Sequence, residues 1–491
     1  GKCVPCRIGL GQLNNFIREV LDGKATMKTL DIMEQTALSI MESADCAIGY
    51  EAANMVYKGL IGYRDDYIEH IQNGRCTCTY NQPVPCVSLC PAHVDIPGYI
   101  ALVGEGRYAD AIRLLRKDNP FPTTCGFICE HPCEARCRRN MVDDSINIRG
   151  LKRVAADFAG EVDPPQCAPS TGKKIAILGG GPGGLSAAYY LQLMGHQTTV
   201  YEMLPELGGM LRYGIPNYRL PKERLDDDIR AILKTGVQVK NGLKIGQDIT
   251  IQELRQQYDV VLITIGASTD KKLGLENEDA DGIISAVQFL RNVGKNQIID
   301  LTGKEVVVIG GGNVSMDAVR TAKRLGAKKV SIVYRRRVAD MTALPGEIEG
   351  AVAEGIELQT LKAPASIDVD ENHHVKGIYV TPQMVSSIRD GRASIKPTGE
   401  EDIYIPCDVL IVAIGQNIET HHFEQAGIPV ERGKIITKST GAFENLPGVF
   451  AGGDCASGPA SVIKAIAAAK VVAANIDEYL GYHHEISCDV E

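Results

Sequence analysis

The chain has 491 residues, too many for one domain, and a hydrophobic fraction of 44% that is sufficient for several complete cores. Its formal net charge of −9 at pH 7 argues against nucleic acid as a partner. No apolar run approaches the roughly 20 residues that a membrane-spanning helix needs. We therefore expect a cytoplasmic protein of about three or four domains.

The predicted elements begin with helices. Apolar residues recur at helical spacing between residues 10 and 41, so residues 1–70 are predicted to form a helical domain. Residues 71–171 are cysteine-rich, and helices are predicted within them at 98–117 and 147–159. Prolines, serine, threonine and glycine near the end of this part predict a linker to the rest of the chain.

Fifteen cysteines are present, and all but four of them fall into three groups in these first two parts. Close spacing upstream of glycine-rich loops favours metal ligation over the disulfides of a secreted protein. Zinc is the alternative metal, but runs with the spacing C-x3-C, one of them followed by Pro91, favour iron–sulfur clusters. The three groups are Cys3, Cys6 and Cys46; Cys76, Cys78, Cys86 and Cys90; and Cys125, Cys129, Cys133 and Cys137. The isolated cysteines, predicted to pack, are Cys167, Cys407, Cys455 and Cys488.

After the linker, buried strands alternate with glycine-rich loops and helices. The unit that begins with the strand at 174–178 is repeated in the unit that begins with the strand at 306–309. Such alternation predicts parallel sheets covered by helices. We predict an α/β fold with two Rossmann-like nucleotide-binding domains, one inserted in the other, preceded by two helical iron–sulfur domains. The outer nucleotide domain comprises residues 172–290 and 417–485, and the inserted one comprises 291–416.

The first glycine-rich loop has the spacing G-x-G-x-x-G, through Gly179, Gly181 and Gly184, with Pro182 between them. These glycines permit a sharp turn and let a pyrophosphate approach the N-terminus of the next helix. Glu202 ends the following strand, 23 residues after Gly179, where an acid that binds a ribose hydroxyl is expected. Strand, loop, helix and acid together predict a dinucleotide site.

The second loop comprises Gly310, Gly312 and Asn313, and Ser315 stands where a third glycine is expected. One strand later, Arg335 and Arg336 stand where the first unit has its acid. An arginine binds a 2′-phosphate that an acid would repel, so this site is predicted to prefer NADP(H). The alternative is that these arginines only form a solvated charged surface.

A third signal lies near the end of the chain. A buried strand within residues 448–454 ends at Asp454, and an apolar helix begins near Ser461. The N-terminus of that helix could face a flavin ring and stabilise its reduced, anionic form.

Several motifs together carry a resemblance to a known family. They are Cys86-x3-Cys90-Pro91, Cys125-Gly126-x2-Cys129, the Gly179 loop, Gly208-Gly209-Met210, Tyr213-Gly214-Ile215-Pro216, Val333-Tyr334-Arg335-Arg336 and Ala451-Gly452-Gly453-Asp454. Through them, residues 71–485 resemble the small (β) subunit of bacterial glutamate synthase and the flavin half of dihydropyrimidine dehydrogenase. Residues 1–70 resemble the C-terminal iron–sulfur domain of the NADH-binding flavoprotein of respiratory complex I, through Cys3-Val4-Pro5-Cys6 and Cys46.

The resemblance implies FAD in the outer nucleotide domain, NADP(H) in the inserted domain and two [4Fe-4S] clusters within residues 71–171. The residues implied to bind FAD beyond the first loop and Glu202 are Gly209, Met210, Gly214, Ile215, Asp454 and Val462. One cluster is expected on Cys76, Cys78, Cys86 and Cys137, with Cys76 in place of a family ligand whose position holds Asn81.

The second cluster is expected on Cys90, Cys129 and Cys133. The family supplies its fourth ligand as glutamine or glutamate, but Lys152 stands at that position, so Cys125 is the expected substitute. The first cysteine group lacks one member of the complex I pattern, which would lie three residues before Cys3. We therefore expect a third cluster whose fourth ligand precedes Gly1 in the full protein.

The resemblance also implies a path for electrons. NADPH gives a hydride to FAD, and the clusters pass single electrons to a partner subunit, for which ferredoxin is one candidate. No general acid or base is predicted, because hydride transfer requires stacking of the nicotinamide on the flavin. The alternatives are a glutamate synthase small subunit, a subunit of a flavin-based electron-bifurcating transhydrogenase, hydrogenase or formate dehydrogenase, and a zinc-containing scaffold without redox activity.

Overall fold

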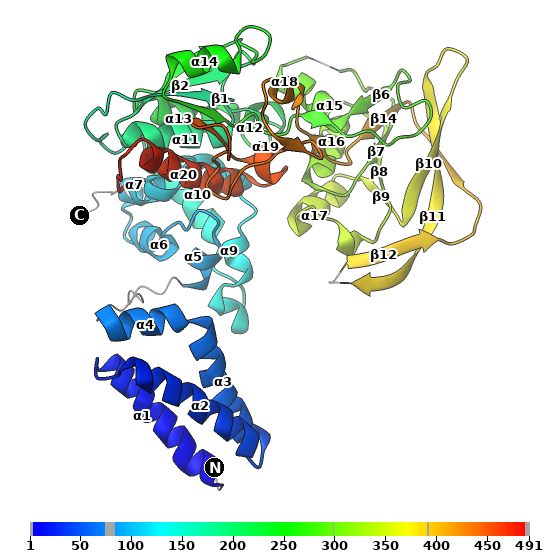
Figure 1. Cartoon of the computed structure of the whole chain (residues 1–491). Coiled ribbons are helices and arrows are strands. Elements are labelled where there is room, and N and C mark those ends of the chain that lie inside the picture. The colour runs from blue at the N-terminus through cyan, green and yellow to red at the C-terminus, as the bar shows by residue number, and fades with distance from the viewer. Residues whose placement is uncertain (1–2, 74–83, 298, 390–391, 487–491) are drawn as a thin grey trace. The chain divides into compact units, whose positions relative to one another are not determined.

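The computed structural model describes residues 3–73, 84–297, 299–389 and 392–486 (Figure 1). The chain divides into two compact units, residues 1–84 and 85–491. None of the described helices is both long and apolar enough to cross a membrane.

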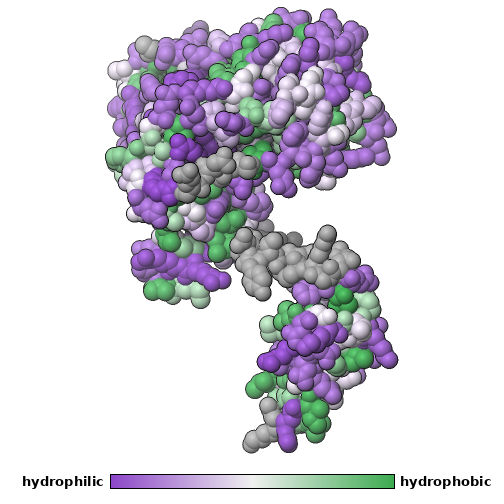
Figure 2. All heavy atoms as spheres, turned by 90° about the vertical axis from the view of Figure 1, so that its left-hand side faces the viewer, coloured by the Kyte–Doolittle hydropathy of each residue, from purple (hydrophilic) through white to green (hydrophobic). Residues whose placement is uncertain are grey.

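The first unit is helical, as predicted. After a short π-helical turn at Pro5–Gly9 it contains α1 (Leu10–Leu21), α2 (Met27–Ser43), α3 (Ala47–Gly62) and α4 (Arg64–Asn73). Its core includes Leu13, Leu30, Met33 and Ala37, which come from α1 and α2 and are almost fully buried. Apolar side chains are also exposed on this unit (Figure 2). Ile48 and Met55 of α3 are among the exposed apolar residues.

The second unit begins with six short helices that share a core with the first parallel sheet. They are α5 (Pro85–Leu89), α6 (Ile96–Gly104), α7 (Tyr108–Asp118), α8 (Pro122–Ile128), α9 (Pro132–Ala135) and α10 (Ile148–Phe158). The helix predicted at 147–159 is confirmed as α10. The single helix predicted at 98–117 is wrong: it is split into α6 and α7, because Gly106 adopts a left-handed conformation with a φ of 74°.

The first sheet has five parallel strands in the order β18-β4-β1-β2-β3. They are β1 (Lys174–Leu178), β2 (Gln197–Glu202), β3 (Gln238–Asn241), β4 (Val260–Ile263) and β18 (Val449–Ala451). One face packs against α11 (Pro182–Leu193), α13 (Lys222–Leu233) and α20 (Val462–Tyr479), and the other against α14 (Ile251–Gln257) and α18 (His421–Gln425). Since β18 joins this sheet from beyond the second one, the predicted insertion is confirmed.

The second sheet repeats this plan in the order β6-β14-β7-β8-β9, also parallel. Its strands are β6 (Ile283–Ser285), β7 (Glu305–Ile309), β8 (Lys329–Tyr334), β9 (Glu357–Thr360) and β14 (Val409–Val412). Its helices are α15 (Ala286–Gly294), α16 (Asn313–Arg324) and α17 (Pro345–Ala353). The predicted domain boundary at residue 291 falls inside α15, whose apolar residues belong to the core of this second sheet.

An antiparallel sheet that the sequence did not predict follows β9 in the chain. It consists of β10 (Lys362–Val369), β11 (Val375–Arg389), β12 (Arg392–Pro397) and β13 (Ile403–Pro406). The two chain segments that pass between the parallel sheets pair with each other, through β5 (Thr269–Asp270) and β15 (Gln416–Asn417). This pairing joins the two nucleotide-binding regions by a short two-stranded ribbon.

Candidate functional site

The first glycine-rich loop connects β1 to α11, which begins at Pro182. Gly179 has a φ of 112°, a conformation that other residues rarely adopt. A Cβ atom on Gly184 would lie 1.9 Å from the carbonyl oxygen of Gly179, so the close contact between loop and helix requires glycine there. A Cβ atom on Gly209 would lie 2.8 Å from the Cα atom of Gly181, which shows how closely the neighbouring loop approaches.

Glu202 stands at the end of β2 and turns its carboxylate toward this loop. The carboxylate accepts hydrogen bonds from the backbone N–H groups of Gly180 (2.7 Å) and Leu204 (2.8 Å). Burial raises the pKa of Glu202, although these backbone N–H groups act in the opposite direction. Glu202 therefore holds the loop in shape as well as facing the cavity beside it.

A cavity lies at the carboxyl ends of the strands of the first sheet, where open α/β sheets bind their ligands. The predicted residues that line it are Gly179, Gly181, Pro182, Glu202, Gly209, Met210 and Asp454. Four predicted residues, Gly184, Gly214, Ile215 and Val462, do not line it. Burial raises the pKa of Asp454 to about 6, despite a hydrogen bond from the backbone of Ala460.

Arg291 lines the same cavity and was missed by the sequence analysis, since it comes from α15 after a long separation from the first loop. One end of its guanidinium donates to the carbonyl oxygen of Ser268 (2.6 Å). Its Nε atom is buried and has no hydrogen-bond acceptor among the described residues. A buried donor without an acceptor beside an open cavity fits a ligand that carries acceptor oxygens there, as a dinucleotide does.

The second glycine-rich loop connects β7 to α16, which begins at Asn313. A Cβ atom on Gly310 would lie 2.3 Å from the carbonyl oxygen of Ala413, so this strand end is as tightly packed as the first. Asn313 accepts a hydrogen bond from the backbone of Leu344 (3.0 Å) and donates one to Glu130 (3.2 Å). Through Asn313, the second loop therefore contacts Glu130, the residue that follows Cys129.

The arginines after β8 differ in their surroundings. Arg336 donates to the carbonyl oxygen of Ala393 in β12 (3.0 Å), and Arg337 pairs with Asp340 (2.8 Å). Arg335 is exposed and has no hydrogen-bond or ion-pair partner among the residues that the structure describes. Of the two predicted arginines, Arg335 is therefore the one whose whole guanidinium can bind a 2′-phosphate.

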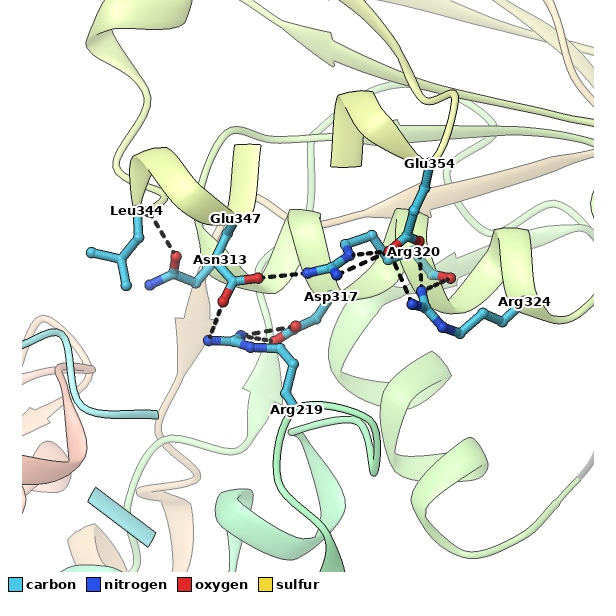
Figure 3. Close-up of polar contacts among 8 residues, drawn as sticks. All are labelled: Arg219, Asn313, Asp317, Arg320, Arg324, Leu344, Glu347 and Glu354. Atoms are coloured by element: carbon cyan, nitrogen blue, oxygen red, sulfur yellow. Dashed lines mark hydrogen bonds and ion pairs between the residues drawn. The ribbon is translucent and has the colours of Figure 1, made fainter. Parts of the chain in front are cut away.

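A buried ion-pair cluster joins the two nucleotide-binding regions (Figure 3). Arg219, in the loop before α13, donates to both carboxylate oxygens of Asp317 in α16 (2.8 and 2.7 Å). It also contacts Glu347 in α17 at 3.1 Å. The side chains of Arg219 and Asp317 are only 11% and 5% exposed. Because α16 carries the second glycine-rich loop at its start, this interdomain ion pair fixes that loop relative to the first sheet.

Four cysteines from three adjacent segments lie together in the helical part, and we call Cys90, Cys125, Cys129 and Cys133 the buried set. Each is less than 8% exposed, and all are free thiols. The Cys125 thiol donates a hydrogen bond to the Oδ1 atom of Asn119 (3.9 Å), and its interaction with the Cys129 side chain raises the pKa of Cys125 and lowers that of Cys129. This is the grouping predicted for the second cluster, and sulfur donors of this kind fit an iron–sulfur cluster.

The buried set is attached to α13, one of the helices that cover the first sheet. Asp228 of α13 is fully buried, and its carboxylate accepts hydrogen bonds from the backbone N–H groups of Thr123 (3.2 Å) and Thr124 (2.7 Å). These are the otherwise unpaired donors at the start of α8, the helix that carries Cys125 and directly precedes Cys129. The contact holds the buried set beside the first nucleotide region.

The other cysteines are only partly described. Cys86 lies near Cys137 and Cys90, whose charges add to the effect of burial in raising the pKa of its thiol. Cys76 and Cys78, the other predicted ligands of that cluster, lie outside the described residues, as does Asn81. In the first unit Cys6 interacts with both Cys3 and Cys46, so the structure brings this group together as well.

One polar cluster was missed by the sequence analysis. His196 and His484 both contact one carboxylate oxygen of the buried Asp477, at 2.9 and 2.8 Å. The second oxygen accepts the backbone N–H of His484 (2.7 Å). These hydrogen bonds pair the three side chains with one another and hold the segment after α20 against the first sheet. The sequence could not predict them, because His196 and Asp477 are 281 residues apart in the chain.

The fold and these sites define a flavin-dependent pyridine nucleotide oxidoreductase. Residues 173–469 match the family described as Pyridine nucleotide-disulphide oxidoreductase, and the chain belongs to it. Residues 62–163 match Dihydropyrimidine dehydrogenase domain II, 4Fe-4S cluster, and residues 1–70 match the NADH-ubiquinone oxidoreductase-F iron-sulfur binding region. The resemblances stated from the motifs are therefore confirmed.

The chain is similar to several named subunits over most of its length. It is 33% identical to the NADP(+)-dependent formate dehydrogenase subunit beta of Moorella thermoacetica, covering 98% of this chain and 77% of that one. It is 35% identical to the NADPH-Fe(3+) oxidoreductase subunit beta of Geobacter sulfurreducens, with 98% and 76% covered. It is 34% identical to the glutamate synthase [NADPH] small chain of Escherichia coli, with 80% and 88% covered.

A solved structure supports the fold alone. FprA from Mycobacterium tuberculosis in complex with NADPH superposes with a TM-score of 0.53 at 20% identity, covering 62% of this chain and 85% of that one. The name of the matching family includes a disulphide, but none of the described residues that line the first cavity is a cysteine.

Proposed function

We propose that the chain is the β-type subunit of an NADPH-dependent oxidoreductase complex. It takes a hydride from NADPH onto FAD and passes single electrons through [4Fe-4S] clusters to a partner subunit. The observation that carries the proposal is the contact between Asp228 and the start of α8, because it places the buried cysteine set directly against the first nucleotide region. One compact unit thus combines sites for two nucleotides with a metal site.

In this proposal FAD occupies the first cavity, where it converts a two-electron donor into single electrons when bound. The residues of the chain bind and orient. Glu202 holds the Gly179 loop, Arg291 offers its free Nε atom, and the glycines allow close approach of the ligand backbone. NADPH is assigned to the Gly310 loop, with Arg335 on its 2′-phosphate.

The order of the clusters follows from their positions along the chain. The buried set adjoins the first nucleotide region and would accept electrons first. The cluster predicted on Cys76, Cys78, Cys86 and Cys137 would come next, because Cys86 lies near Cys90 of the buried set. The group of Cys3, Cys6 and Cys46 would be the exit to the partner. The relatives that are named as β subunits support a hetero-oligomer.

The coverage by relatives favours one kind of subunit. We favour a β subunit like that of NADPH-Fe(3+) oxidoreductase or NADP(+)-dependent formate dehydrogenase over a glutamate synthase small chain. The two former relatives match 98% of this chain, whereas the small chain matches 80%. The first unit, with its separate cysteine group, accounts for the difference in length.

Anaerobic titration of the purified protein with NADPH tests the proposal. We expect a brown protein that contains FAD and iron, whose flavin and iron–sulfur absorbance both bleach. A colourless protein that contains zinc instead of iron would contradict it. Glutamine-dependent glutamate formation with a partner subunit would assign the chain to glutamate synthesis instead.

The nucleotide preference makes a separate prediction. Arg335→Glu should weaken NADPH binding by about 1.5–3 kcal/mol, because a charge-assisted hydrogen bond to the 2′-phosphate is lost and repulsion replaces it. NADH binding should change little, and titration of the flavin with each nucleotide measures both. Lys328→Glu is the matched control, since Lys328 is exposed and directly precedes β8, at the end of the strand opposite Arg335. Equal weakening of NADPH and NADH by Arg335→Glu would refute the assignment.

A further inference from the structure

Lys152 is a buried cation in an unusual setting. It lies on α10 and is 6% exposed, although lysine is almost never buried without a partner. Its Nζ atom lies 6.0 Å from the ring centroid of Tyr99, whose hydroxyl donates to the carbonyl oxygen of Ile148 one turn earlier (2.9 Å). Among the described residues, no carboxylate lies within ion-pair distance of Lys152.

Lys152 lies beside the buried set. Its helix, α10, packs so closely on α8 that a Cβ atom on Gly126 would lie 3.1 Å from the Cα atom of Arg153, and Arg149 donates to the carbonyl oxygen of Cys129 (3.1 Å). Burial lowers the pKa of Lys152, but the charges of Tyr99, Cys129, Cys125 and Cys90 raise it overall, and the charge of Lys152 also acts on Cys133. The four cysteines among these residues are the whole of the buried set. The buried set thus provides four ligand sulfurs, and Lys152 provides a positive charge beside them. An ammonium group has no lone pair with which to bind iron, whereas Cys125 can complete the coordination.

We infer that Lys152 is the counter-ion of the cluster held by the buried set and raises its reduction potential. The inference rests on the proposed function, since it requires a cluster on these four cysteines. Such a cluster carries net negative charge, and reduction adds one electron, supplied by NADPH through the flavin, without moving a proton. A nearby cation in a poorly solvated site stabilises the reduced cluster more than the oxidised one. Lys152 therefore favours transfer of the electron from the flavin into the buried set.

The test is a potentiometric titration of the full chain with its partner, followed by electron paramagnetic resonance. Lys152→Met removes the charge and keeps an unbranched side chain that is only one atom shorter. We expect its cluster to have a lower midpoint potential, while the other clusters keep theirs and the iron content is unchanged. Lys152→Arg should keep the potential near that of the wild type. Lys117→Met, on the neighbouring α7, is the control and should change nothing.

Two results would overturn the inference. An unchanged midpoint potential in Lys152→Met, with iron intact, would show that the charge does not act on the cluster. Loss of about four irons with a changed spectrum would show that Lys152 is a ligand. If Lys152→Met does not fold, Lys152→Gln compared with Lys152→Arg makes the same comparison of neutral and charged side chains. A wild-type protein without iron would refute the proposed function itself, which is a different outcome.

Discussion

Cys129→Ser should remove about four irons per flavin and prevent electrons from leaving the flavin, while NADPH still reduces the flavin. Cys129 directly follows α8, is 5% exposed, and accepts a hydrogen bond from the backbone N–H of His131 (3.4 Å). A serine oxygen is a poor substitute for a thiolate as an iron ligand. Removing a residue that only contacts a metal ligand already lowers metal affinity or activity by ~10–100-fold. Loss of a ligand itself should cost more, so we expect NADPH-dependent reduction of the acceptor to fall at least ~100-fold.

The measurements are iron analysis and two rates, for reduction of the flavin by NADPH and for reduction of the acceptor. Cys125→Ser should behave like Cys129→Ser, because Cys125 is the proposed fourth ligand. Cys167→Ser is the matched control: Cys167 is an isolated, exposed thiol that contacts only the backbone of Thr235 (3.6 Å) among the described residues. A Cys125→Ser protein with full iron content would show that the fourth ligand comes from elsewhere.

Local geometry explains why the two nucleotide loops could be predicted. The glycines are required by contacts within one strand–loop–helix unit, as between Gly184 and Gly179, so the pattern is present in a short stretch of sequence. The arginine pattern was less informative. Arg335, Arg336 and Arg337 are equivalent in the sequence, and only their three-dimensional surroundings show that two of them already have partners.

Features that depend on distant contacts could not be predicted. Arg291 reaches the first cavity from α15, and Asp228 caps a helix more than 100 residues earlier in the chain. The antiparallel sheet was missed because its central strand, β11, contains Gly377 and Pro382, and both residues weaken the sequence pattern of a strand. Lys152 was recognised as a departure from the family pattern, but its burial beside four cysteines appears only in the folded chain.

Arg219→Met should break the interdomain ion pair and slow hydride transfer at saturating NADPH. The substitution leaves Asp317 buried without its partner, a change that typically costs about 3–5 kcal/mol. The attachment of α16 to the first sheet is weakened as a result. A misplacement of the nicotinamide by about 1 Å can cost ~100-fold in rate, so flavin reduction should fall by ~10–100-fold. Binding of NADPH should change much less, and stopped-flow measurements separate the two.

The double variant Arg219→Met/Asp317→Asn decides whether the uncompensated charge is the cause. Burial already raises the pKa of Asp317 to about 6, against the opposing effect of Arg219, and without Arg219 the pKa should rise further. The single variant should therefore recover part of its rate as the pH is lowered, because protonation removes the buried charge. The double variant should recover at pH 7, since a neutral pair carries no such penalty. Lys329→Met is the control, because Lys329 in β8 pairs with Glu357 in β9 (3.2 Å), and both residues belong to the second sheet. If flavin reduction in Arg219→Met equals that of Lys329→Met, the two regions are positioned by other contacts.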